Sequence, residues 1–316
     1  VVFFRPSEAA DSPRPTILYL FGHGESIGSE AHVFAIRMAK KGYNVCMLDT
    51  YGQMERSIVA AGNDYHGGYP GARLLTAGIA EMGVQMLDAM QAVSYISSRS
   101  DVDTTRLGVT GGSGGGQQSM LLTAIDDRID AAALSSTPYV CAPENFLAHF
   151  CTAEGVPNWA TFTSENYMLA ALAPKPILRM SGAEADSVGS QGKFEERHQF
   201  VSDTYAGVGA ADRFVVKSHS GTHGYSQPAR ESAYGFFDKF FLGEGDGSPI
   251  AESGLPASLP KVADYKAYQN YLYPIENMTT TDEFRLMILN EVYEQRSDLS
   301  AEETRAALEE TVAHEV

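Results

Sequence analysis

Ser113 lies in a glycine-rich run, Gly-Gly-Ser-Gly-Gly, which has the G-x-S-x-G pattern of a serine nucleophile. An apolar run, residues 107–110, precedes it, and a helix-compatible run, residues 117–125, follows it. We predict a strand, a sharp turn and a helix, with Ser113 held in a strained backbone conformation between small neighbours. The serine hydroxyl could then attack a carbonyl carbon, while the N–H of Gly114 stabilises the oxyanion.

A nucleophilic serine needs a general base, which follows it along the chain in this arrangement. His223 is the predicted base because it precedes the last predicted helix of this region and is followed by a glycine. His219, in the same loop, is the alternative base.

The base needs an acid that orients it, and we expect this acid just after a late strand. Asp186 is the predicted acid and Glu184 its close rival, since both follow the strand predicted at residues 176–180. Glu144, in the loop one strand earlier, is a third candidate.

A second oxyanion donor is expected in the loop after an early strand. This loop reads Gly-His-Gly-Glu, and we predict the N–H of Gly24 or Glu25 as the donor. The predicted substrate pocket is lined by side chains from this loop and from two aperiodic segments, namely His23, His66, Trp159 and Phe162.

Neither a metal nor another cofactor is predicted. His66, Cys141 and His149 lack the spacing of a metal site, which needs three or four ligands. Three cysteines do not make a disulfide framework, although Cys141 and Cys151 could pair, and Cys46 lies in an apolar run.

Strands and helices alternate around these residues. This order predicts an α/β fold with a mostly parallel sheet that helices cover on both faces. The predicted strands are residues 1–4, 16–21, 43–48, 106–110, 129–135, 176–180 and 213–217, and the predicted helices are 29–41, 79–97, 192–205 and 227–241.

Residues 1–242 form the predicted catalytic domain, in which residues 137–174 are an insertion expected to act as a lid or pocket wall. Residues 243–260 are rich in Gly, Ser and Pro and are predicted as a linker. Residues 261–316 form a predicted helical extension, with a capping box at Ser300 and Glu303. Its helices are candidates for packing on the core or on a second copy in a homo-oligomer.

The net charge of −17 and the pI near 4.8 argue against a nucleic-acid partner. The chain has no apolar run of 18 residues, so no membrane span is predicted. No signal peptide is visible, which leaves the compartment open between the cytoplasm and export with the signal removed.

Several segments, among them FGHG, DYHGG, VTGGSGGGQQS and THGYSQP, together resemble bacterial α/β-hydrolases of the acetyl xylan esterase-like type. More distantly, the chain is similar to catalytic domains of the dienelactone-hydrolase and prolyl-oligopeptidase types. The resemblance spans about residues 16–242 and implies the α/β-hydrolase fold, a serine–histidine–acid triad and ester hydrolysis. By position it makes Ser113 the nucleophile and His223 the base, whereas the acid segment is shifted by one residue.

The expected function is therefore that of a serine carboxylic-ester hydrolase, acting through an acyl-enzyme on short-acyl or carbohydrate-linked esters. The alternatives are a serine peptidase of the prolyl-oligopeptidase type and a catalytically silent interaction domain on the same fold.

Overall fold

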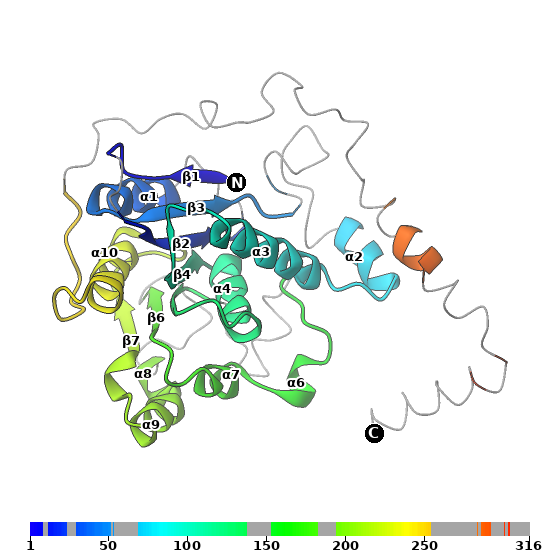
Figure 1. The fold of residues 1–316 in the computed structure, drawn as a ribbon. Coiled ribbons are helices and arrows are strands. Elements are labelled where there is room, and N and C mark those ends of the chain that lie inside the picture. The colour runs from blue at the N-terminus through cyan, green and yellow to red at the C-terminus, as the bar shows by residue number, and fades with distance from the viewer. Residues whose placement is uncertain are drawn as a thin grey trace.

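The computed structural model describes residues 1–8, 12–23, 30–51, 53, 69–137, 153–182 and 194–253, together with 283, 286–291, 300 and 303. Within these residues a seven-stranded sheet has the order β1-β3-β2-β4-β5-β6-β7 (Figure 1). The edge strand β1 pairs antiparallel with β3, and the other strand pairs are parallel. The strands are β1 (Val2–Phe4), β2 (Arg14–Leu20), β3 (Asn44–Leu48), β4 (Val102–Gly112), β5 (Ala131–Ser135), β6 (Ile177–Gly182) and β7 (Phe214–His219).

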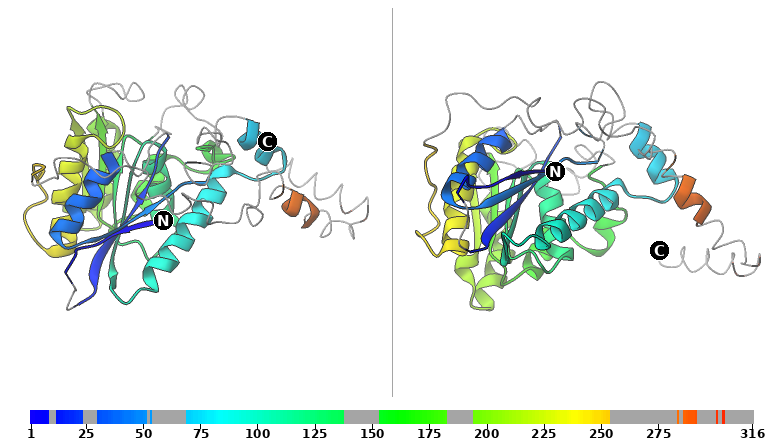
Figure 2. Two further views of the ribbon diagram at one scale, coloured as in Figure 1. Left: turned by 90° about the horizontal axis from the view of Figure 1, so that it is seen from above. Right: turned by 45° about the horizontal axis from the view of Figure 1, so that its top comes forward.

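Helices cover both faces of the sheet, with α1 and α10 on one face and α3 and α4 on the other (Figures 1 and 2). The helices are α1 (Glu30–Lys41), α2 (Tyr69–Thr76), α3 (Glu81–Ser97), α4 (Gly114–Ile125), α6 (Trp159–Phe162), α7 (Glu165–Ala171), α8 (Phe194–Arg197), α9 (Gln199–Gly207) and α10 (Gln227–Phe237), with the short turns η2 (Ala211–Arg213) and η3 (Asp238–Leu242).

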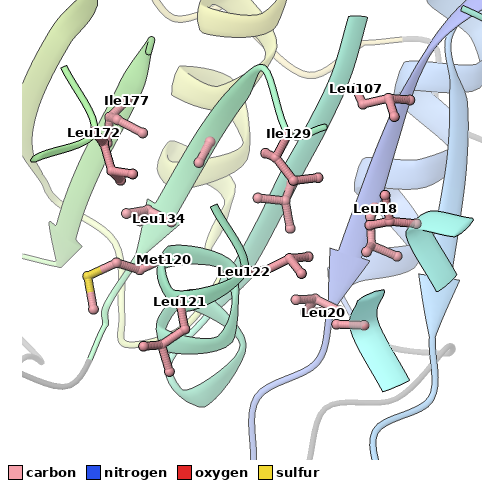
Figure 3. Close-up of a cluster of buried hydrophobic side chains, with 14 of the residues drawn as sticks. Leu18, Leu20, Leu107, Met120, Leu121, Leu122, Ile129, Leu134, Leu172 and Ile177 are labelled. Carbon is pink, nitrogen blue, oxygen red and sulfur yellow. The ribbon is translucent and has the colours of Figure 1, made fainter. Parts of the chain in front are cut away.

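The strands are apolar on both faces because each face is covered. In β2, Leu18 and Leu20 point into the core layer beneath α3 and α4, whereas Ile17 and Tyr19 point into the layer beneath α1 and α10. This is the period of two that a strand imposes. Figure 3 shows the first layer, where leucines of β2 lie on the same side of the sheet as those of α4.

The second layer is rich in aromatic side chains. The ring of Phe34 in α1 contacts Tyr225 edge-on and stacks on Tyr234 of α10, with centroid separations of 5.5 and 5.6 Å. Tyr19 of β2 also meets Tyr225 edge-on, at 5.3 Å. These contacts fix the loop before α10 against the centre of the sheet, and this loop carries His223.

The predicted α/β fold with a mostly parallel sheet is confirmed, but three elements differ from the sequence analysis. The predicted helix 192–205 is two helices, α8 and α9, which are separated at the buried His198. The predicted helix 227–241 ends as an α-helix at Phe237 and finishes in η3. The segment 51–78, which has no clear period, contains α2.

Residues 243–253, the first part of the predicted linker, pack back on α10. Arg230 donates two hydrogen bonds to the carboxylate of Glu252, at 2.6 and 3.0 Å, and the N–H of Ile250 donates to the carbonyl of Glu231. At the C-terminus the predicted capping box is confirmed, because Ser300 and Glu303 exchange side chain–backbone hydrogen bonds. The domain boundaries themselves stay a prediction. Within the described helices, none has both the length and the apolarity needed to cross a bilayer.

Candidate active site

Ser113 stands between the last residue of β4 and the first residue of α4, in a backbone conformation that is rare outside glycine. Its φ of 55° and ψ of −126° place it at a sharp strand-to-helix elbow. Such a conformation costs about 1–3 kcal/mol and persists only where the surroundings hold it. The N–H of Ser113 donates to the carbonyl of Ser135 at 2.9 Å, and its own carbonyl accepts from Gln117.

The elbow packs directly against the loop that carries His223. A Cβ at Gly112 would lie 2.9 Å from the carbonyl carbon of Gly224 and 3.0 Å from the nitrogen of Tyr225. A side chain at position 112 therefore has no room. The residue before the serine touches the residue after the histidine, which brings Ser113 and His223 to the same end of the sheet.

The two candidate bases occupy different surroundings. His219, the last residue of β7, is buried, and its Nδ1 accepts a hydrogen bond from the N–H of Gly221 at 3.1 Å. His223 is exposed. The ring of His219 thus orders its own loop, whereas the ring of His223 is accessible to a substrate.

Ser135, at the end of β5, connects the nucleophile to this loop. Its carbonyl accepts the N–H of Ser113, and its hydroxyl donates to the carbonyl of Gly224 at 2.6 Å. A second link lies one residue further along, where the hydroxyls of Tyr225 and Thr110 are hydrogen-bonded. One buried residue of the sheet therefore fixes the separation between the serine and the loop of the predicted base.

Replacing Ser135 by alanine is expected to lower kcat by about 10- to 100-fold, because the loop of His223 would lose its tether. The buried Gly224 carbonyl would also lose its donor, which costs about 1–3 kcal/mol of stability. Thr123→Ala is the matched control, since it removes a buried hydroxyl in α4 that donates to the Ser119 carbonyl, away from the loop. Equal kcat losses in the two variants would contradict the tether.

His23 lies on the other side of the elbow. A Cβ at the preceding residue, Gly22, would come within 3.2 Å of the Ser113 Cβ, so this loop borders the nucleophile. Burial and the nearby positive charge of His223 lower the pKa of His23 to about 4, so its ring is neutral near pH 7. Gly24 and Glu25 lie outside the described residues, and the second oxyanion donor stays a prediction.

The candidate acids Asp186, Glu184 and Glu144 also lie outside the described residues. A buried ion cluster holds the elements on either side of the segment 183–193. Arg179 of β6 donates to Glu165 at 2.7 Å, and its guanidinium lies over the ring of Phe194, the first residue of α8. Burial would raise the pKa of Glu165, but the charges of Arg179 and His198 outweigh it and lower the pKa to about 2.

Among the three acids, Asp186→Asn is expected to be the damaging change, lowering kcat by about 10⁴-fold, because an asparagine no longer stabilises the imidazolium of the base. Glu184→Gln and Glu144→Gln serve as parallel variants with the same loss of charge. Steady-state kinetics on one aryl ester decide the matter. If Glu184→Gln caused the larger loss of kcat, Glu184 would be the acid. If neither Asp186→Asn nor Glu184→Gln lowered kcat, the role would pass to Glu144.

The insertion 137–174 reaches the elbow through Glu154, whose Oε1 lies 3.3 Å from Nδ1 of His23. The two aromatic residues of this insertion that were predicted to line the pocket, Trp159 and Phe162, have different surroundings. Trp159 is 2% exposed and belongs to the core layer beneath α3 and α4, while Phe162 is 65% exposed. Neither lines the described pocket beside Gly114. His66 lies outside the described residues, and substrate contacts by these three rings stay predictions.

Because Trp159 is buried in the core, Trp159→Ala is expected to destabilise the protein by about 3–5 kcal/mol and to lower Tm clearly. Turnover of different esters by the folded fraction should fall by a similar factor for each. Phe162→Ala is the control, since its exposed ring contributes little to packing. A changed ranking of esters at an unaltered Tm would instead make Trp159 part of the substrate pocket.

Among the described residues, no three His, Cys, Asp or Glu side chains are grouped to hold a metal ion. Cys46 is buried in β3 as a free thiol, and burial raises its pKa to about 12. Cys141 and Cys151 lie outside the described residues, so their pairing stays untested.

Comparison with known proteins agrees with this geometry. The family model of acetyl xylan esterases matches residues 2–148, the part of the chain that contains the elbow. A Bacillus subtilis (strain 168) protein named as a hydrolase, YtaP, is 27% identical over 255 residues, which are 75% of this chain and 82% of that protein.

Solved structures give the fold. Methylesterase BT1017 has a TM-score of 0.61 at 23% identity, covering 79% of this chain and 54% of its own length. The chain has the α/β-hydrolase fold. A family 15 carbohydrate esterase, the glucuronoyl esterase from Caldicellulosiruptor kristjansonii, has a TM-score of 0.56 at 14% identity, covering 82% of this chain and 78% of that one. The chain thus spans about half the length of BT1017.

Sequence reasoning missed two residues that border the elbow. Ser135 is a small residue at a strand end, and no local pattern predicts its bond to a carbonyl 89 residues away. Glu154 lies in an insertion without periodicity. A polar residue at the carboxyl end of a predicted parallel strand is the one signal that would have pointed to Ser135.

Proposed function

We propose that this chain is a serine hydrolase of carboxylic esters, and that its substrates are short-acyl or carbohydrate-linked esters. The observation that carries the proposal is the strained elbow at Ser113, packed against the loop of His223 at the carboxyl ends of β4 and β7. The similarity of residues 2–148 to acetyl xylan esterases supports the carbohydrate-linked substrate class.

In the proposed reaction the Ser113 hydroxyl attacks the ester carbonyl while His223 accepts its proton. The N–H of Gly114, at the first residue of α4, donates to the oxyanion that develops. The protonated His223 then gives its proton to the leaving alcohol. Water, deprotonated by the same ring, hydrolyses the acyl-enzyme and releases the acid.

A panel of substrates tests the proposal. Aryl acetates, acetylated xylo-oligosaccharides and peptidyl amides would be assayed with the purified chain, and a fluorophosphonate probe would report the reactive serine. Hydrolysis of the esters with little cleavage of the amides is expected. Preferential cleavage of peptidyl amides would favour a peptidase, and failure of both turnover and labelling would favour a catalytically silent domain.

A further inference from the structure

Arg179 of β6 is the largest fully buried side chain of the described residues, with 1% of its surface exposed. Its Nε donates to Oε1 of Glu165 in α7 at 2.7 Å, and Glu165 is also fully buried. A buried ion pair is often no more stabilising than two apolar side chains of the same volume. The presence of this arginine in an otherwise apolar strand therefore directs attention to what its other nitrogens hold in place.

Those two nitrogens connect the carboxyl ends of two neighbouring strands. Nη1 of Arg179 donates to the carbonyl of Met180 in β6 at 2.8 Å, and Nη2 donates to the carbonyl of Thr137, just beyond β5, at 3.2 Å. The Met180 carbonyl also accepts the N–H of Ser136 at 3.0 Å. The guanidinium thus joins β5 and β6 at the point where the pairing of the two strands ends.

Both strand ends contact the loop of His223, one on each side of the histidine. A Cβ at Gly182, the last residue of β6, would lie 3.0 Å from the carbonyl oxygen of Thr222. The hydroxyl of Ser135, the last residue of β5, donates to the carbonyl of Gly224 at 2.6 Å. The residues before and after the histidine are therefore placed by two strand ends, and the arginine fixes the separation of those ends.

The guanidinium is in turn held by α8 and the residue that follows it. It lies over the ring of Phe194 at 5.1 Å, and His198 donates from Nδ1 to the Phe194 carbonyl while its Nε2 lies 3.8 Å from Oε1 of Glu165. In the same helix, Glu195 accepts hydrogen bonds from the N–H and the hydroxyl of Ser218 in β7, at 3.0 and 2.8 Å. These contacts link α7, α8 and the end of β7 around the arginine.

We propose that Arg179, oriented by Glu165, is a positioning residue for the proposed base His223. It acts through the backbone of the two strand ends, which place the residues on either side of the histidine. The arginine thereby sets the approach of the imidazole to the Ser113 hydroxyl. This inference rests on the proposed ester hydrolysis, in which His223 accepts the proton of Ser113.

The main variant for the test combines Arg179→Met with Glu165→Met, which removes the ion pair without leaving a single buried charge. Its kcat on an aryl acetate is expected to fall by about 10- to 100-fold, because a small misplacement of a reacting group has an effect of this size. Its KM should stay within about threefold of the wild type. Turnover is lowered rather than abolished, since the hydrogen bond from Ser135 to the loop remains.

Arg179→Lys is the conservative variant, and it keeps the test decisive if the double Met variant does not fold. The lysine keeps a positive charge beside Glu165, but it offers one nitrogen in place of three. It therefore cannot reproduce the connection between the Met180 and Thr137 carbonyls. A loss of kcat of at least about threefold is expected at a temperature where the variant is fully folded.

A double-mutant cycle with His223→Ala separates positioning from a general loosening of the fold. If the arginine acts through His223, the two Met substitutions should lower the residual kcat of His223→Ala by less than about threefold. Tyr43→Phe is the stability control, because it removes a buried hydroxyl that donates to Asp238 at 3.0 Å, beside the amino end of β3. It should lower Tm and leave kcat within about twofold of the wild type.

Two results would overturn the positioning role. One is a kcat within about twofold of the wild type in the folded arginine variants. The other is an equal fold-loss of kcat in the wild-type and His223→Ala backgrounds, which would mean that the ion pair only supports the fold. Neither result affects the proposed function, since the wild type would still hydrolyse the ester. If the wild type does not hydrolyse it, the proposed function fails, and the positioning role fails with it.

Discussion

Replacing Ser113 by alanine is expected to abolish ester turnover, with a loss in kcat of roughly 10⁴- to 10⁶-fold. The reason is that no other described hydroxyl occupies the elbow, where the backbone is strained and the N–H of Gly114 begins α4. An alanine meets the same backbone strain as the serine, so the melting temperature should stay close to that of the wild type. The measurements are kcat on an aryl acetate, labelling by a fluorophosphonate and Tm.

Ser98→Ala is the control for this variant, because Ser98 is an exposed serine at the end of α3. It should keep wild-type turnover and labelling. Substantial turnover by a purified Ser113→Ala protein that is free of wild-type enzyme would remove Ser113 from the mechanism, and with it the proposed acyl-enzyme.

The second large effect is expected at His223. His223→Ala should lower kcat by roughly 10³- to 10⁶-fold with little change in Tm, because the ring is exposed and its proposed task is proton transfer. His219→Ala should have the opposite profile, with a clear loss of Tm and a smaller loss of kcat. The latter ring is buried and accepts the N–H of Gly221, so its removal disturbs the loop rather than the proton transfer.

The pair of variants is informative because the two histidines are only four residues apart, His219 at the end of β7 and His223 in the loop that follows. If His219→Ala removes turnover at an unchanged Tm while His223→Ala retains it, the roles of the two rings are exchanged. Equal losses of kcat and of Tm in both variants would mean that the loop acts only as a structural unit.

The parts of this protein that could be predicted from sequence are those set by neighbouring residues. The elbow at Ser113 follows from six consecutive small residues between an apolar run and a helix-compatible run, and the strands follow from short apolar runs. The contact between Gly112 and Gly224 could not be predicted, since it joins residues more than a hundred positions apart. The break between α8 and α9 is equally non-local, because His198 is buried 3.8 Å from Glu165 of α7.

The candidate site divides in the same way. Ser113 and His223 carry patterns in their own vicinity, whereas Glu154 and Gln85 become neighbours only when the insertion and α3 both pack near the start of α4. The predicted acid is intermediate between these two cases. Its strand, β6, was predicted correctly, but the pattern after the strand contains two carboxylates and does not choose between them.

The bonds of Ser135 have a consequence for how such a protein can diverge. The serine and the loop of His223 both make hydrogen bonds to Ser135, which lies in the interior of the sheet and outside the inserted segment. Under the proposed function, substitutions in the insertion can therefore alter substrate preference while these hydrogen bonds keep the proposed nucleophile beside the loop of its proposed base. Selection for a new substrate could then act on the insertion while the proposed nucleophile and the loop of its base are inherited unchanged.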